Sequence, residues 1–135
     1  MKETIRDILS RTKRIAVVGA SNNPARPSFE VMGFLIRQGF DVTPVNPGLA
    51  GQEILGRKVV ASLDEAGALD MVDLFRNSAA VEAPVADAIR LGAKTIWMQL
   101  GVVNETAATA ARAAGLAVVM DRCPAIEMPR LGLAK

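Results

Sequence analysis

Short apolar segments recur along the chain at the intervals that separate strands from one another in α/β proteins. Each segment is a nearly continuous aliphatic run, which is typical of strands covered on both faces of a sheet rather than on one. Glycine or polar residues bound every run, as they do at strand ends. The expected strands are residues 14–19, 41–46, 70–75, 94–99 and 116–120.

Between these runs, apolar residues recur at helical spacing. In 28–38, Val31, Phe34 and Leu35 share one face, and Gly39 follows as the expected C-cap. Asn104 is the expected N-cap of a later helix. The expected helices are residues 3–12, 28–38, 80–91 and 104–114.

This alternation predicts an α/β fold over residues 1–135 as a single domain. The expected architecture is a Rossmann-like, doubly wound parallel sheet of five strands with helices on both faces. Because crossovers between parallel strands are right-handed, few strand orders remain. We expect the order 3-2-1-4-5, with the first strand central. Pro44 violates the pattern mildly, since it cannot donate a ladder hydrogen bond.

Composition removes several classes of function. The net charge of +2 is too small to indicate a nucleic-acid partner, and no apolar stretch approaches the roughly 20 residues needed to span a membrane. The chain has no His and no Tyr, so the usual general base and the commonest transition-metal ligand are missing. The single cysteine, Cys123, excludes an internal disulfide and fits a cytoplasmic protein. An enzymatic role is therefore not favoured.

In open α/β sheets, ligands bind beyond the carboxyl ends of the strands. Polar residues that a core does not need gather in the loops expected at that edge. The first loop leads from a strand into a helix, where backbone N–H groups and the helix dipole favour an anion such as pyrophosphate. The five loops are residues 19–28, 46–48, 76–78, 99–101 and 121–124.

The first two loops depart from the pattern of nicotinamide-binding domains. Gly19 supplies the tight turn, but the G-x-G-x-x-G fingerprint would need glycine at Ser21 and Pro24. Such domains commonly end the second strand with an acidic residue that binds ribose, whereas this chain has Asn46 followed by Pro47. No Arg follows in 48–51 to favour NADP. Both nicotinamide cofactors are disfavoured, while Arg26 could reach a phosphate.

One motif at each strand end carries a resemblance to a known family. The ordered set resembles the small stand-alone proteins that bind coenzyme A (CoA), which are similar to the N-terminal domain of the succinyl-CoA synthetase alpha subunit. The resemblance covers roughly residues 9–131. The motifs are Gly19-Ala20-Ser21, Arg26-Pro27-Ser28, Val45-Asn46-Pro47, Phe75-Arg76, Gln99-Leu100-Gly101-Val102 and Asp121-Arg122-Cys123-Pro124.

The resemblance implies that CoA lies across the carboxyl edge, with its pyrophosphate at 19–22 and its adenosine near 46–47 and 75–76. The synthetase has a Lys after its second strand where this chain has Leu49, so Arg26 or Arg76 would have to replace it. The phosphohistidine domain of the synthetase is absent, so its ligase chemistry is not implied. The expected cofactor-binding residues are Gly19, Ala20, Ser21, Asn22, Arg26, Ser28, Asn46, Pro47, Phe75, Arg76, Met98, Gln99, Leu100 and Cys123.

Several of these residues have a plainer interpretation. Ser21 and Asn22 could serve only as turn residues, and Arg26 and Arg76 only as solvated charges. Cys123 could be a small buried hydrophobe, or a thiol that forms a mixed disulfide with CoA.

The leading hypothesis is a non-catalytic protein that binds a nucleotide ligand, CoA or acyl-CoA. The alternatives are an NAD(P)-dependent oxidoreductase, a CoA-dependent enzyme subunit that requires a partner protein, and a regulatory protein that reads CoA as a signal. The amphipathic segment at the start of the chain could also mediate a homodimer.

Overall fold

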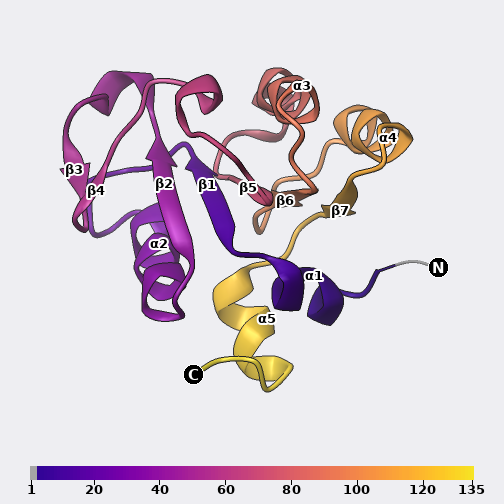
Figure 1. Ribbon diagram of the computed structural model, residues 1–135, viewed down its shortest axis with the longest axis horizontal. Helices are drawn as coiled ribbons and strands as arrows, with labels where there is room; N and C mark the ends of the chain where they lie inside the picture. Colours follow the sequence, from indigo (N-terminus) through magenta and orange to yellow (C-terminus); the bar gives the residue numbers. More distant parts are fainter. Residues whose placement is uncertain (1–2) are drawn as a thin grey trace.

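Five parallel strands form the central sheet, and each lies within one of the expected apolar segments. A computed structural model describes residues 3–135 and places the strands in the order β2-β1-β5-β6-β7 (Figure 1). The observed strands are a residue or two shorter than expected: each ends one residue earlier, and β5, β6 and β7 also begin one residue later. They are β1 (Arg14–Val18), β2 (Asp41–Val45), β5 (Met71–Leu74), β6 (Thr95–Met98) and β7 (Ala117–Val119).

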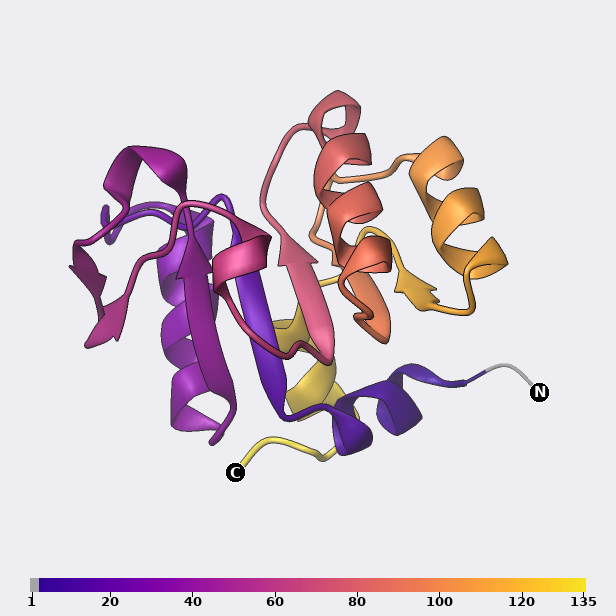
Figure 2. The ribbon, with the colours of Figure 1, turned by 45° about the horizontal axis from the view of Figure 1, so that its top comes forward.

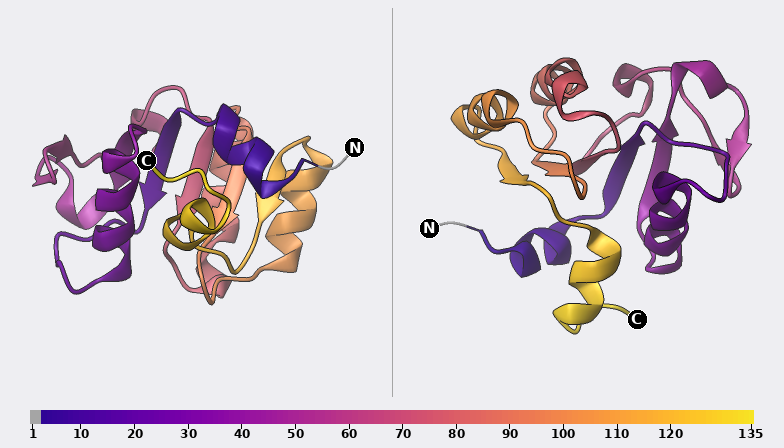
Figure 3. Two further views of the ribbon diagram at one scale, coloured as in Figure 1. Left: turned by 90° about the horizontal axis from the view of Figure 1, so that it is seen from below. Right: turned by 180° about the vertical axis from the view of Figure 1, so that it is seen from behind.

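Helices cover both faces of this sheet, as expected (Figure 3). On one face lie α1 (Ile5–Arg11), α2 (Pro27–Arg37) and α5 (Pro124–Arg130). On the other lie α3 (Glu82–Arg90) and α4 (Glu105–Ala113), the latter capped by Asn104. Successive residues of each strand alternate between two apolar clusters, one beneath each helical layer. Within residues 3–135, no helix has the length and apolar character needed to cross a bilayer.

The α/β class, the five parallel strands and the two helical layers are confirmed, but the expected strand order was wrong. Segment 70–75, taken as the third strand, pairs with β1 and not with β2. The outer edge of β2 is occupied instead by Val60, which forms a parallel bridge with Val45. Val60 N donates to Pro44 O at 3.0 Å, and Asn46 N donates to Val60 O at 3.0 Å. The single bridging residue Val60 therefore occupies the place beside β2 that the expected order gave to segment 70–75. That segment forms β5, which lies on the other side of β1.

The same bridge explains how Pro44 fits within a strand. Pro44 O faces Val60, and in a strand the N and O atoms of one residue face the same neighbour. The missing N–H of Pro44 therefore lies on the outer edge of β2, and the ladder between β1 and β2 loses no donor.

The connection from β2 to β5 contains short elements that the apolar pattern did not predict. A hairpin of two two-residue strands lies beyond β2, at the end of the sheet away from β7 (Figure 2). Its turn residues Leu55 and Gly56 have φ of 51° and 81°, the left-handed values of a tight hairpin turn. The elements are β3 (Glu53–Ile54), β4 (Arg57–Lys58) and the 3₁₀ turns Pro47–Leu49 and Leu63–Glu65; a further 3₁₀ turn, Ser78–Ala80, precedes α3.

A topological switch point lies between β1 and β5. After β1 the chain enters α2 on one face, and after β5 it enters α3 on the opposite face. The two loops therefore diverge at the carboxyl ends of adjacent strands, which is where open α/β sheets form a ligand crevice.

Candidate functional site

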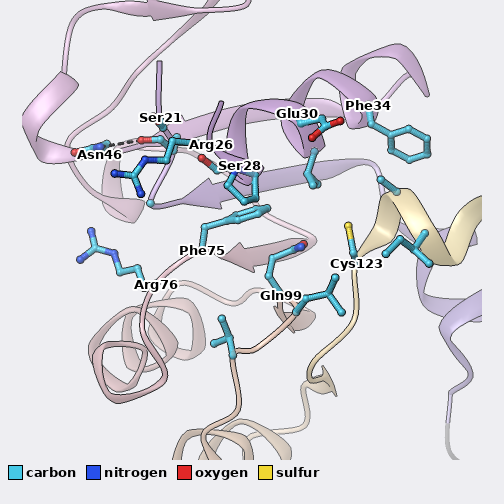
Figure 4. A pocket seen from close by; sticks show the side chains of 18 of the residues that line it. Ser21, Arg26, Ser28, Glu30, Phe34, Asn46, Phe75, Arg76, Gln99 and Cys123 are labelled. Carbon is cyan, nitrogen blue, oxygen red and sulfur yellow. Dashed lines mark hydrogen bonds between the residues drawn. The ribbon is translucent and has the colours of Figure 1, made fainter. Parts of the chain in front are cut away.

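A cleft of about 780 Å³ opens at this switch point. It lies between α2 and α5 and is floored by the loops that follow β1, β5 and β6 (Figure 4). Most of the residues selected from the sequence converge here from separate strand ends. Those that line the cleft are Gly19, Ala20, Ser21, Arg26, Ser28, Asn46, Phe75, Arg76, Gln99, Leu100 and Cys123.

Three selected residues do not line the cleft. Met98 is fully buried and belongs to the cluster beneath α3 and α4, on the opposite face of the sheet. Asn22 and Pro47 are exposed beside the cleft. A direct ligand contact is therefore not supported for Met98, and the roles of Asn22 and Pro47 stay predictions.

The cleft also contains residues that were not among the expected cofactor-binding residues. On α2, the sequence reasoning used apolar spacing only to define a core face. A helix at the rim of a crevice has one side that faces the core, one that faces solvent and one that faces the crevice. The spacing of apolar residues does not distinguish the side that faces the crevice from the side that faces the core. On α2 the side that faces the crevice carries polar as well as apolar residues. Pro27, Asn77 and Val102 also line the cleft and lie in motifs or loops that the sequence placed at this edge. The lining residues that the sequence reasoning missed are Glu30, Val31, Phe34, Arg37, Ala125 and Ile126.

The loop after β1 is held close to the loop after β5. Gly19 has φ of +85°, and a Cβ atom built there would lie 2.3 Å from the carbonyl oxygen of Phe75. Further along, Asn23 N donates to Ser21 Oγ at 3.0 Å, and Ala25 N donates to Asn23 Oδ1 at 3.0 Å. The loop is thus ordered by its own turns before it reaches α2.

Asn46 joins the loops after β1 and β2. Its Nδ2 atom donates to Ala20 O at 2.8 Å, and its Oδ1 atom accepts from Gly48 N at 2.8 Å. Both ends of the amide are therefore engaged with the backbone. The position that carries the ribose-binding acid in nicotinamide domains is filled here by a residue that connects two loops.

One end of the cleft is cationic. Arg26 and Arg76 are exposed there, on the loops that follow β1 and β5 (Figure 4). Within residues 3–135, neither guanidinium forms an ion pair. Arg26 is also the N-cap residue of α2 and places no side-chain hydrogen bond on its first turn. Two guanidinium groups and the positive end of a helix dipole thus converge on one region.

The other end of the cleft is lined mainly by apolar side chains, although the carboxylate of Glu30 lies beside Phe34 on α2 (Figure 4). Val31 and Phe34 of α2 face Ala125 and Ile126 of α5 across it, and Ile126 is 52% exposed although it is apolar. Cys123, at the start of α5, has its thiol turned toward this end and is 6% exposed (Figure 4).

Beneath this floor lies a buried polar pair formed by Gln99, which was selected from the sequence, and Asp73, which the sequence reasoning missed. Asp73 of β5 is fully buried, and Gln99, directly after β6, is 5% exposed. The terminal amide of Gln99 lies 2.8 Å from Asp73 Oδ1 and 3.1 Å from Oδ2. Burial raises the pKa of the Asp73 carboxyl well above its ordinary value of 3.8. An acid within an otherwise apolar strand was the available signal.

Hydrogen bonds fix the loops at the remaining strand ends. Asp121, with φ of 59°, accepts from Gly101 N at 2.8 Å. Ser78 Oγ accepts from Val103 N at 3.0 Å, which joins the loops after β5 and β6. Trp97 Nε1 donates to Arg122 O at 2.8 Å. The rim of the cleft is therefore braced by contacts between loops.

The fold and cleft define a Rossmann-like α/β protein with an open cleft at the switch point of its sheet. Residues 13–129 match the family described as the CoA binding domain, and the chain belongs to that family.

Two relatives match this chain over nearly its whole length. The uncharacterized protein YneT of Bacillus subtilis (strain 168) is 40% identical over 123 residues, which are 90% of each chain. The structure of a hypothetical protein from Pyrococcus horikoshii OT3 is 40% identical, covers 97% of this chain and 99% of its own, and superimposes with a TM-score of 0.89.

A larger protein shares the fold alone. The dinucleotide-forming acetyl-coenzyme A synthetase 1 of Ca. Korarchaeum cryptofilum is 23% identical, with a TM-score of 0.67. The match covers 78% of this chain but 25% of the synthetase.

Proposed function

We propose that this protein binds CoA or an acyl-CoA in the cleft at the carboxyl edge of its sheet. The observation that carries the proposal is the polarity of the cleft, which changes from cationic to apolar along its length in a member of the CoA binding domain family. CoA has a matching distribution of charge, because its phosphates lie at one end and its thiol lies at the end of a long uncharged arm.

The phosphates fit the cationic end. Arg26 and Arg76 present guanidinium forks that no carboxylate of residues 3–135 neutralises. In the turn at 19–23, the backbone N–H groups of Ser21 and Asn22 bond to no acceptor of residues 3–135, and such groups beside a helix N-terminus bind pyrophosphate. The pantetheine arm then runs past Phe75 toward Gln99, and the thiol end reaches the region of Cys123.

A nicotinamide oxidoreductase fits less well. Asn46 is uncharged and its amide already bonds to Ala20 and Gly48, so it binds ribose hydroxyls less strongly than the acidic residue of nicotinamide domains would. The chain has no His and no Tyr to relay a proton to or from a substrate at neutral pH. We therefore propose a binding role without catalysis by this chain alone.

Charge removal at the phosphate end tests this proposal. Arg26→Ala and Arg76→Ala should each weaken CoA binding at least about tenfold, since a charge-assisted hydrogen bond contributes roughly 1.5–3 kcal/mol. Arg112→Ala is the matched control, because Arg112 is an exposed residue of α4 on the opposite face of the sheet. Isothermal titration measures all three variants beside the wild type. Equal losses in all three, or unchanged affinity in the first two, would contradict the assignment of the phosphate end.

A further inference from the structure

Asp73 occupies a position where an acid is costly to the fold. It lies in the central strand β5, in register between Val17 of β1 and Trp97 of β6. Its side chain is fully buried, and within residues 3–135 no cation pairs with it. Burial of an unpaired carboxylate is strongly unfavourable, and a neutral or apolar residue would suit this strand better. An acid retained beneath a ligand cleft is therefore a candidate for a role in the site.

The contact with Gln99 can take one of two forms. An ionised Asp73 would accept from Gln99 Nε2, and the amide oxygen Oε1 would then face the cleft. A protonated Asp73 would donate its O–H to Gln99 Oε1, and Nε2 would face the cleft. The 2.8 Å separation from Asp73 Oδ1 fits a hydrogen bond in either form. Complete burial without a cation favours the protonated form.

We propose that Asp73 is a positioning residue: its protonated carboxyl holds the Gln99 amide with the N–H₂ group facing the cleft, where it donates to a carbonyl oxygen on the pantetheine–acyl arm of the ligand. This inference rests on the proposed binding of CoA or acyl-CoA. Gln99 stands between Phe75 and Cys123 along the wall of the cleft (Figure 4), which is the path of that arm. Two groups on the arm offer the required acceptor, the pantetheine amides and the carbonyl of an acyl thioester.

The donor also gives the site a means of selection. Gln99 is 5% exposed, so a ligand that fills the cleft removes the remaining water from its amide. A carbonyl oxygen at this place restores the lost hydrogen bond. A ligand without one leaves a buried donor unpaired, which lowers its affinity.

Binding of three ligands to paired variants tests the inference. CoA, acetyl-CoA and the thioether S-ethyl-CoA are titrated into the wild type, Gln99→Leu, Asp73→Leu and Asp73→Asn. Loss of one neutral hydrogen bond should weaken binding about fivefold in Gln99→Leu and in Asp73→Leu. Asp73→Asn should keep wild-type affinity, because its N–H₂ group donates to Gln99 Oε1 as the protonated carboxyl does.

The three ligands identify the carbonyl group. A loss confined to acetyl-CoA assigns the donor to the thioester, and an equal loss for all three assigns it to a pantetheine amide. Wild-type affinity of Gln99→Leu for every ligand would overturn the inference while leaving the proposed function intact. Failure of the wild type to bind any of the three would instead refute the proposed function.

The protonation state of Asp73 can be measured without a ligand and without the Asp73→Leu variant. Infrared spectra at neutral pH should contain the carbonyl band of a protonated carboxyl in the wild type, and the band should be missing in Asp73→Asn. Thermal melting verifies that Asp73→Asn is folded. A wild-type spectrum without this band would show that Asp73 is ionised and would overturn the proposed orientation of Gln99.

Discussion

Gly19 is the residue at which β1 turns into the cleft, and two separate constraints act on it. Its φ of +85° is left-handed, a conformation that costs an L-residue about 1–2 kcal/mol. The carbonyl oxygen of Phe75 also occupies the space of a side chain, 2.3 Å from where Cβ would be. The close approach of the first and third loops of the cleft therefore depends on the absence of a side chain.

The two constraints can be separated by mutation. Gly51→Ala meets a similar φ of +88° but open space around its Cβ, so it should lose only about 1–2 kcal/mol of unfolding free energy. Gly19→Ala should lose clearly more, because the backbone of the Phe75 loop must also move. Urea denaturation measures both. Equal losses would show that the contact with Phe75 is accommodated freely.

Individual residues also show which parts of the cleft could be predicted from the sequence and which could not. Ser21, Arg26 and Gln99 could be selected because they follow apolar strands, and parallel strands end at a shared edge. Met98 was selected with them, yet its side chain points to the opposite face, since one residue along a strand reverses the direction. The engagement of both ends of the Asn46 amide depends on the paths of two loops, which no local pattern contains.

At the scale of elements, Asp70 fastens the start of β5 to the start of β1. One of its carboxylate oxygens accepts from Lys13 N at 2.9 Å and from Arg14 N at 3.0 Å. Partial burial by itself would raise the pKa of Asp70, but the N–H donors of Arg14 and Lys13 and the charge of Lys94 outweigh it and lower the pKa. The carboxylate thus stabilises the native pairing of the two central strands.

This contact predicts a pH dependence. Because the folded state lowers the pKa of Asp70, its contribution is present above the ordinary value of 3.8 and is lost as pH falls through the folded value. Asp70→Asn should therefore be less stable than the wild type by about 1 kcal/mol at neutral pH. The difference should shrink toward pH 3.

Chemical denaturation across pH measures this, with Glu65→Gln as a control for the loss of one negative charge at an exposed site. A difference between Asp70→Asn and the wild type that stays constant with pH would contradict the assignment.

Helices and strands could be predicted from the sequence where they are long enough to show an apolar pattern. The five strands follow from short, mostly apolar segments, and the main helices follow from apolar residues at helical spacing. The hairpin of β3 and β4 has two residues in each strand, and the bridge at Val60 has one, so neither produces a periodic signal. Missing Val60 led directly to the wrong strand order, because it left the outer edge of β2 free for segment 70–75.

At the scale of the whole molecule, the site depends on topology. Adjacent strands β1 and β5 send their chains to opposite faces, and α5 returns to stand opposite α2 across the opening. The cleft thereby obtains a cationic end from two loops and an apolar end from two helices. This polarity, together with membership of the CoA binding domain family, supports a ligand that is charged at one end only.

Isothermal titration of the wild-type protein with CoA, beside NAD and NADP under the same conditions, tests the central claim most directly. The account predicts saturable binding of CoA and no heat of binding for either nicotinamide cofactor, because the unpaired guanidinium groups meet the phosphates of CoA, while an uncharged Asn46 stands where nicotinamide domains carry the acidic residue that binds ribose. Binding of NAD or NADP in place of CoA, or of none of the three, would contradict it.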